Sequence, residues 1–285
     1  METINVSKED FISNREFILS KDSTITIDGT NISQLNLKPK YYYQNELKRN
    51  ITFMTFGNEQ YRRPLYRIIC ESLKIPIFKR IIGYDETALK NSAEFWSKNG
   101  EFILNNPRGY GFWIWKSYLI LKTLEQMDDN DILIYADSGC CIYETGLQRL
   151  NEYITRADNH PSGMLTFQTG NPWNLESYYT KMDVIKELNA EQLLNTYQII
   201  AGIQIIRKNA VSIRHIQRWY DLCCNHHLIS DKDSIIPNTS NFKEHRHDQS
   251  IFSILCKLNR IGTIPDETET GNPSIPIHAA RKRDN

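Results

Sequence analysis

The chain has no excess of charge of either sign and no long apolar run. Its 285 residues include 34 basic and 34 acidic side chains, so no overall field draws it to nucleic acid or to an anionic membrane. No apolar stretch reaches the roughly 18 residues that a membrane-spanning helix requires. The first residues, METINVSKEDF, are acidic where a signal peptide needs a basic start and an apolar stretch. We therefore expect a cytoplasmic protein with no transmembrane segment and no nucleic-acid partner.

The sequence also lacks cysteine spacing typical of a metal site, internal repeats, and linkers that would divide it into several domains. Four of the six cysteines form the adjacent pairs Cys140-Cys141 and Cys223-Cys224, and none has the CxxC spacing of a metal site. Adjacent cysteines rarely bridge each other, so we interpret all six as reduced thiols. There is no internal repeat and no low-complexity linker after residue 48. A polar extension over residues 1–48, with one alternating strand at Thr24–Ile27, followed by one domain over 49–285, is the simplest organisation.

The apolar runs predict an α/β fold. Strands are expected at ITFMTFG (51–57), IPIFKRIIG (75–83), DILIYADSG (131–139), SGMLTFQ (162–168) and AGIQIIRKN (201–209). Helices are expected at about 60–73, 92–99, 112–127, 211–226 and 247–259. Strands that alternate with helices indicate a single Rossmann-like domain, in which helices flank a mostly parallel central sheet.

Ligands of such sheets bind beyond the carboxyl ends of the strands, which directs attention to Asp137. Four apolar residues carry this carboxylate to the end of a strand, and Ser138 and Gly139 allow the chain to turn there. Asp137 would either contact a ligand there or only cap the next segment, because Asp often caps turns. Both interpretations stay open. Upstream, PRGYGFWIWKSY (107–118) combines two glycines with Arg108 and Lys116, a composition that suits a pyrophosphate site. Its aromatic residues are better explained as core.

Together, RGYGFWIWKSY and LIYADSG resemble nucleotide-sugar-dependent glycosyltransferases of the GT-A type. The resemblance is to a bacterial and viral group that shares an RGYGxWxWKP-like segment before a DxG strand tip. NTYQIIAGIQIIRKN and HRHDQSIFSIL are similar to the same group, so the resemblance covers about residues 51–283. It implies a GT-A fold, with a nucleotide-sugar half over 49–145 and an acceptor half over 146–285. It also implies transfer of a hexose from a nucleoside-diphosphate sugar, with UDP favoured, to a hydroxyl of a glycan or glycoconjugate, in polysaccharide biosynthesis. The location would be cytoplasmic, or the host cytoplasm for a viral protein.

The resemblance further implies a donor site. The end of the first strand, with Thr55, Gly57 and Asn58, would lie near the nucleotide base. Asp137-Ser138-Gly139 corresponds to the DxD motif, which binds the ribose and, through the diphosphate, a divalent Mn²⁺ or Mg²⁺. Gly139 stands where the second Asp usually coordinates the metal, which puts metal dependence in question. The remaining implied donor residues are His278 as a late metal ligand and the cations Arg108, Lys116 and Arg281, with Lys282 and Arg283 beside them in the tail.

The acceptor side is implied by residues in the second half of the chain. Asp248 corresponds to the carboxylate that an inverting enzyme uses as its base, although the residue alone is better explained as a helix cap. The side chains His247 and Gln249 adjoin it, and His247 with His245 has only a weak metal-site spacing. Gln198 and Gly202, with Ala201 between them, suit a strand edge that lines a sugar pocket. Trp173 suits stacking on an acceptor sugar or filling a loop.

Two other functions remain open. A nucleotidyltransferase typically has a glycine-rich basic loop after its first strand, whereas TFGNEQYRRP has one glycine. A non-catalytic nucleotide-sugar or carbohydrate-binding protein is compatible with Gly139 in place of a metal-binding carboxylate. Turnover of a donor separates this second alternative from an enzyme.

Overall fold

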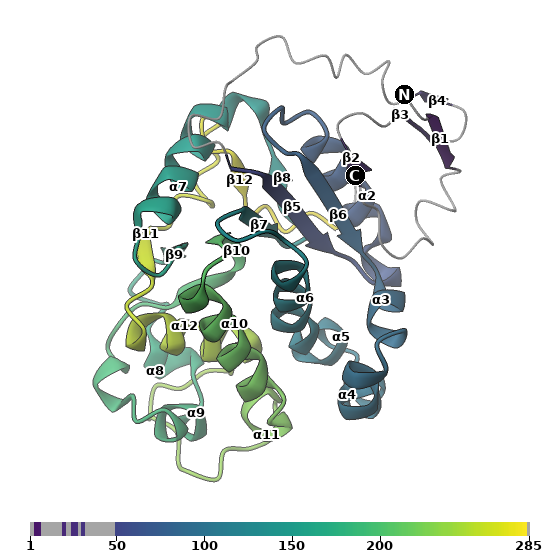
Figure 1. Ribbon diagram of the computed structural model, residues 1–285. Coiled ribbons are helices and arrows are strands. Elements are labelled where there is room, and N and C mark those ends of the chain that lie inside the picture. Colours follow the sequence, from purple (N-terminus) through teal and green to yellow (C-terminus); the bar gives the residue numbers. More distant parts are fainter. Residues whose placement is uncertain (1–2, 7–18, 21–23, 28–29, 32–48, 284–285) are drawn as a thin grey trace.

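A computed structural model describes residues 3–6, 19–20, 24–27, 30–31 and 49–283, and its centre is one large sheet (Figure 1). The described residues form seven strands of this sheet in the order β11-β9-β10-β7-β5-β6-β2. Their bounds are β2 (Leu19–Ser20), β5 (Ile51–Phe56), β6 (Arg80–Tyr84), β7 (Ile132–Ala136), β9 (Met164–Gln168), β10 (Ile199–Arg207) and β11 (Gly262–Pro265). Strand β10 is antiparallel to β7 and β9, and β2 is antiparallel to β6, whereas the other neighbours are parallel. The expected α/β class with a mostly parallel sheet is confirmed.

Helices cover both faces of the sheet. The longer ones are α2 (Arg62–Ser72), α4 (Ala93–Asn105), α6 (Ile114–Glu125), α7 (Leu147–Asn159), α10 (Ala210–Cys223) and α12 (His247–Leu258). Shorter turns are η2 (Glu59–Tyr61), α3 (Glu86–Lys90), α5 (Gly109–Phe112), η3 (Glu144–Gly146), α8 (Glu176–Tyr179), α9 (Met182–Glu187), η4 (Glu191–Leu193) and α11 (His226–Ile229). Among the described residues, no helix is both long and apolar enough to cross a membrane.

The alternation of side chains along the central strands assigns each helix layer its own core. On one face, Met54 of β5 and Leu133 and Tyr135 of β7 pack with α4, α6, α10 and α12. On the other face, Phe53 and Ile134 pack with α2 and α7. Both strands are buried on both faces, which explains why their sequences are continuous apolar runs. The period of two also fixes the direction of the residue after β7, because Asp137 follows Leu133 and Tyr135 toward the face that α6 covers.

Most expected elements are present, with informative differences at their ends. Expected strand 75–83 begins only at Arg80, since the residues before it form turns. The expected helix 112–127 begins at Ile114, because residues 109–113 wind in the opposite hand. The amphipathic helix α7 was not expected. Strand Thr24–Ile27 is present as β3, which pairs with β1 (Thr3–Val6) and β4 (Thr30–Asn31). Division into an extension and a domain at residue 48 stays a prediction, because 32–48 lie outside the described residues.

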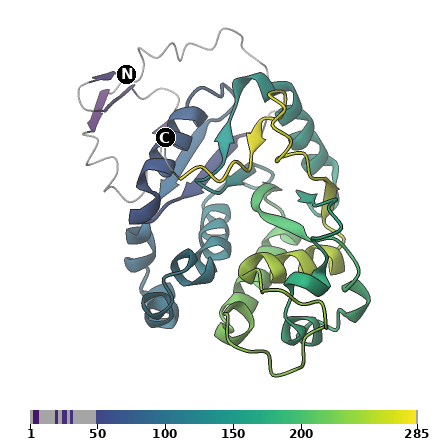
Figure 2. The same ribbon diagram turned by 180° about the vertical axis from the view of Figure 1, so that it is seen from behind.

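A two-stranded sheet places a segment from near residue 280 beside the end of β7. Strand β12 (Ile277–His278) pairs antiparallel with β8 (Cys141–Ile142), and the two strands lie side by side in Figure 2. The residues that follow β12 pass over the turn after β7, where the Lys282 N–H donates to the Gly139 carbonyl. All six cysteines fall within the described residues and are free thiols.

The N-terminus of α10 carries a capping box that a single substitution can test. The Asn209 side chain accepts hydrogen bonds from the backbone N–H groups of Val211 and Ser212, and the Ser212 hydroxyl accepts one from Asn209. Asn209→Ala should lower the free energy of unfolding by about 0.5–2 kcal/mol, measured by urea denaturation. Arg218→Ala, exposed on the same helix, is the control. Equal midpoints for the two variants would show that the cap contributes nothing.

Candidate active site

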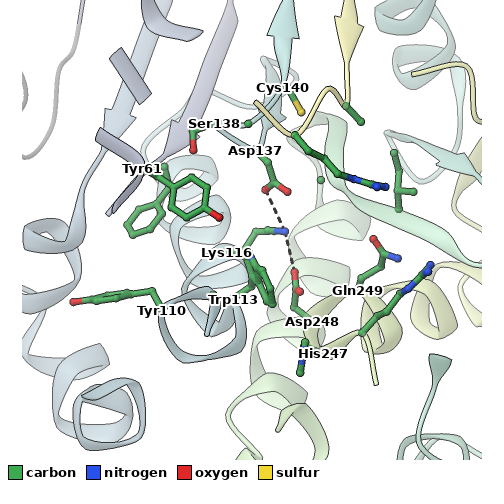
Figure 3. A pocket seen from close by; sticks show the side chains of 18 of the residues that line it. Tyr61, Tyr110, Trp113, Lys116, Asp137, Ser138, Cys140, His247, Asp248 and Gln249 are labelled. Carbon is green, nitrogen blue, oxygen red and sulfur yellow. Dashed lines mark ion pairs between the residues drawn. The ribbon is translucent and has the colours of Figure 1, made fainter. Parts of the chain in front are cut away.

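A cavity of about 650 Å³ opens where β5 and β7 end, between the N-terminal ends of α6 and α12 (Figure 3). Its floor includes residues that follow β5 and β7 and the backbone of β10. Its walls include the aromatic rings of Phe56, Tyr61, Tyr110, Trp113 and Trp115. Among the described residues, five basic and three acidic side chains line it. They are Arg108, Lys116, Arg246, Arg281 and Arg283, and Asp137, Asp248 and Glu269.

The centre of the cavity is a lysine that joins two carboxylates. The Lys116 Nζ lies 3.2 Å from Asp137 Oδ1 and 3.1 Å from Asp248 Oδ2 (Figure 3). Lys116 and Asp248 side chains are 4% and 5% exposed, whereas that of Asp137 is 38% exposed. The buried pair therefore holds its position, and Asp137 is the carboxylate that presents a surface to a ligand.

Burial and charge act in opposite directions on this group of three. Burial alone lowers the pKa of Lys116, but the neighbouring charges of Asp137 and Asp248 outweigh it and raise that pKa to about 12. Burial raises the pKa of Asp248 to about 6, against the opposing effect of Lys116. Lys116 is consequently an ammonium at neutral pH, and Asp248 is a carboxylate that protonates in mildly acidic solution.

A left-handed turn places Lys116. Five consecutive residues, Gly109 to Trp113, have φ values of 59°, 53°, 83°, 53° and 61°. Backbone N–H groups of Phe112 and Trp113 still donate to carbonyls four residues earlier, at 2.8 and 3.1 Å. A left-handed conformation costs about 1–2 kcal/mol per residue other than glycine. Packing offsets the cost, because the Trp115 indole donates to the Gly109 carbonyl at 2.9 Å and Phe112 is buried.

A second strained residue places Asp248. His247 has a φ of 53°, and its ring lies 4.6 Å from the ring of Phe112 in the left-handed turn. The Trp219 indole donates to the Asp248 carbonyl oxygen at 3.0 Å. Arg246 occupies the N-cap position of α12. The interpretation of Asp248 as the helix cap is therefore wrong: Asp248 lies inside the first turn, and its carboxylate reaches Lys116.

The turn after β7 is fixed from three sides. Tyr135 donates its hydroxyl to Asp137 Oδ1, and the Asp137 N–H donates to the Gly202 carbonyl at 2.8 Å. From α2, Arg67 donates to the Ser138 carbonyl at 3.0 Å. A Cβ at Gly202 would lie 2.9 Å from Asp137 Oδ2, so only glycine lets β10 approach this carboxylate.

The segment after β12 closes the cavity. The Lys282 N–H donates to the Gly139 carbonyl at 2.9 Å, so this segment lies on the DxG turn. Arg281 forms an exposed ion pair with Glu269. The Arg283 guanidinium carbon lies 6.0 Å from the centre of the Tyr61 ring.

Most residues expected at the site line this cavity. Those that do are Gly57, Asn58, Arg108, Lys116, Asp137, Ser138, Gly139, Gly202, His247, Asp248, Gln249 and Arg281. Their individual roles stay predictions. Arg108 faces carboxylates as well as the cavity, since it lies 3.1 Å from Asp231 and 3.7 Å from Glu244. His247 donates from Nδ1 to the Ile229 carbonyl, and burial lowers its pKa, so it is neutral.

Four expected residues lie outside the lining. Thr55 is fully buried within β5. Trp173 is 64% exposed and does not line the cavity, although its neighbour Asn174 does. The Lys243 Nζ lies 5.3 Å from the centre of the Trp173 ring. Gln198 is fully buried, yet its Oε1 accepts from Arg246 and Gln249, two residues that do line the cavity. His278 is buried, and its Nε2 lies 2.9 and 3.0 Å from the carbonyls of Asn272 and Ile275.

Sequence reasoning did not select Arg246, Tyr61 or Glu269 as site residues. Arg246 stands within the HRHDQ cluster, where attention went to its neighbours. Tyr61 follows the first strand in NEQYRR, and an aromatic residue so close to a strand end could have been proposed as part of a cavity wall. Tyr135 was not singled out either, although its spacing of two from Asp137 places both on one face of β7. Nothing near Glu269 in the sequence marks it, because its contact with Arg281 depends on the path of the chain between β11 and β12.

The donor set does not fit the divalent metal that the GT-A resemblance implies. Asp137 Oδ1 already accepts from Tyr135 and Lys116, and the second acidic position of the turn is Gly139. His278 donates to two carbonyls and does not line the cavity. Across the described residues, no group of three or more His, Cys, Asp or Glu side chains is arranged to hold a metal ion.

The fold and cavity define an α/β protein with a basic, aromatic-walled site at the carboxyl ends of its central strands. A scan against protein-family models and a search of curated proteins find no match. Among solved structures, mouse xyloside xylosyltransferase 1 in its apo form matches with a TM-score of 0.40 and 10% identity, over 76% of this chain and 84% of that one. Similarity of this size assigns neither a family nor an activity, so function is argued from the cavity itself.

The close approach of β10 to Asp137 gives a direct test of the site geometry. Gly202→Ala should lower the free energy of unfolding by about 1–3 kcal/mol, because the added methyl would displace the Asp137 carboxylate, which Tyr135 and Lys116 hold in place. Gly170→Ala is the matched control, since nothing lies within 4 Å of its Cβ position. Denaturation midpoints measure both. In the double variant Gly202→Ala/Asp137→Ala the two costs should not add; full additivity would contradict the contact.

Proposed function

We propose that the protein is a glycosyltransferase that moves a sugar from a nucleoside-diphosphate sugar, with UDP favoured, to a hydroxyl of a glycan or glycoconjugate. The observation that carries this proposal is the Lys116-linked pair of carboxylates inside a cavity in which basic side chains outnumber acidic ones. The sequence resemblance to GT-A enzymes implies Lys116 and Asp137 at a donor site and Asp248 on the acceptor side, which supports the proposal independently.

The cavity has separate surfaces for the parts of such a donor. Aromatic rings of Phe56, Tyr61 and Tyr110 line the side next to β5, where a base can stack. Guanidinium groups are available from Arg108, Arg281 and Arg283, and each can donate two parallel hydrogen bonds to a phosphate. The exposed face of Asp137 accepts hydrogen bonds from ribose or sugar hydroxyl groups.

Asp248 is the proposed general base. In the transfer step, the acceptor oxygen bonds to the anomeric carbon while the bond from that carbon to the diphosphate breaks. The hydroxyl proton passes to Asp248, and the electron pair of the broken bond leaves with the nucleoside diphosphate. Lys116 remains an ammonium throughout and stabilises the negative charge that moves toward the cavity cations. A base on the acceptor side gives inversion at the anomeric carbon.

A binding protein without catalysis is the second candidate, because Gly139 removes one carboxylate from the usual motif. Thermal-shift screening of nucleoside diphosphates identifies the base that either candidate recognises. Incubation with the matching donor sugar then decides between them, since a binding protein releases no nucleoside diphosphate. A screen in which no nucleoside diphosphate raises the melting temperature would contradict both.

The pKa of Asp248 predicts the pH dependence of the transfer. Below about pH 6 the carboxylate protonates and cannot accept a proton, so kcat/KM should fall about tenfold per pH unit. Because Lys116 and Asp137 interact with Asp248, the apparent pKa belongs to the group of three. Asp248→Asn should lower turnover by about 10²–10⁴ and remove this acid limb. A variant that keeps both turnover and limb would rule out Asp248 as the base.

The same shift has a consequence for stability. A carboxyl whose folded pKa is raised favours folding below its ordinary value of 3.8, and this contribution is lost as pH rises through about 6. As pH rises from 4 to 7, wild type should therefore lose this contribution while Asp248→Asn does not, so the difference in free energy of unfolding between them should change in favour of the variant. Urea denaturation across this range provides the measurement without any substrate.

Arg283 tests the contribution of the C-terminal segment to donor binding. Removal of one charge-assisted contact costs about 1.5–3 kcal/mol, so Arg283→Ala should raise the calorimetric Kd for the nucleoside diphosphate by about 10–150-fold. Lys282→Ala is the control, because Lys282 holds the segment through its backbone N–H and its side chain does not line the cavity. Equal affinities for the two variants would remove Arg283 from the site.

A further inference from the structure

Lys116 occupies the place between two carboxylates that a divalent cation would otherwise take. Its Nζ lies within 3.2 Å of one oxygen from each of Asp137 and Asp248. The ammonium is 4% exposed and lies at the closed end of the cavity. Two neighbouring carboxylates, one of them buried, repel each other unless a cation lies between them, and here the chain itself supplies that cation.

While Lys116 is present, the oxygens that could hold a metal between the two carboxylates are already paired. Asp137 Oδ1 accepts from Tyr135 as well as Lys116, and Oδ2 faces the backbone of Gly202. Gly139 and His278 add no oxygen ligand for Mn²⁺ or Mg²⁺, so a metal at this point would depend on the two carboxylates that Lys116 occupies, with water completing its shell. The absence of a second carboxylate at Gly139 and the presence of buried Lys116 therefore go together, because Lys116 supplies the positive charge that a metal would otherwise provide.

The remaining cations of the cavity lie where an anionic ligand would meet them. Arg108, Arg281 and Arg283 have exposed side chains at its opening, and Arg246 lines the α12 side. Arg246 is held by Gln198 and lies 3.5 Å from the centre of the Tyr179 ring. These guanidinium groups can bind a diphosphate directly, without an ion between them and the phosphates.

We infer that Lys116 replaces the divalent metal of GT-A enzymes, so that this protein binds its nucleoside diphosphate through Lys116 and the cavity arginines without a metal ion. The inference rests on the proposed function for the identity of the ligand. It adds that the Asp137–Asp248 pair is a latent metal site, which Lys116 keeps closed.

Removal of the ammonium tests the latent site without any nucleotide. Lys116→Ala leaves two carboxylates without a counter-charge, so Mn²⁺ alone should raise the melting temperature of this variant by at least about 3 °C. Wild type should not respond to Mn²⁺. Lys122→Ala, exposed on the same helix and paired with Glu125, is the matched control and should behave as wild type. If Lys116→Ala does not fold, Lys116→Gln replaces it in the same measurement, because the Gln amide still donates hydrogen bonds to the carboxylates without carrying a charge.

The nucleotide arm uses UDP and isothermal titration calorimetry on the full chain. For wild type, the Kd for UDP should change by less than about threefold between excess EDTA and added Mn²⁺. For Lys116→Ala it should rise by at least about tenfold in EDTA and recover in part with Mn²⁺.

The outcomes separate the inference from the function on which it rests. An equal Mn²⁺ response in wild type and Lys116→Ala would overturn the inference, as would a wild-type Kd that rises tenfold in EDTA and returns with Mn²⁺. Absence of UDP binding in both conditions would count against a UDP-sugar transferase, while the Mn²⁺ comparison would still decide the role of Lys116.

Discussion

The ion pairs of one buried lysine determine how the two halves of the cavity meet. Asp137 belongs to the turn after β7, and Asp248 belongs to the first turn of α12, more than a hundred residues later. Lys116 from α6, the helix that directly precedes β7, binds both, so the first half of the chain and the distant α12 share one charge centre. Loss of Lys116 would leave the buried Asp248 carboxylate without a counter-charge, which is far more costly than loss of an exposed ion pair. The chain therefore depends on this contact to keep the cavity in one arrangement.

Backbone strain on both sides of that contact is consistent with its importance. The turn at 109–113 and the residue His247 adopt left-handed conformations, and Phe112 and His247 pack against each other. Residues other than glycine adopt such conformations only where the surrounding structure compensates for the cost. Here the compensation comes from the aromatic core beneath α6 and from the Trp219 indole, which donates to the backbone of Asp248. Stability is thus exchanged for a fixed separation between an ammonium and two carboxylates.

Local patterns were sufficient for the sheet but not for the contacts between its edges. Continuous apolar runs identified β5, β7 and β10, because buried strands must be apolar on both faces. The apolar run before Asp137 assigned this carboxylate to the carboxyl end of its strand. The same reasoning could not find the hand of the 109–113 turn, since Tyr110 and Phe112 carry no sign that they adopt positive φ. It also assigned Lys116 to a phosphate, because nothing in the spacing of Lys116 and Asp248 shows that α6 and α12 begin at the same cavity.

The exposure of its ion pairs divides the cavity into a mouth and a floor with different responses to ionic strength. Arg281 and Glu269 at the mouth have side chains that are 82% and 55% exposed, so dissolved salt screens them over a Debye length of about 8 Å at 0.15 M. The Lys116 contacts on the floor are shielded from solvent ions by the protein around them. Added salt should slow the approach of an anionic ligand while it leaves the geometry that receives the ligand unchanged. The rate of association and the structure of the bound state are thus controlled by different charges of the same cavity.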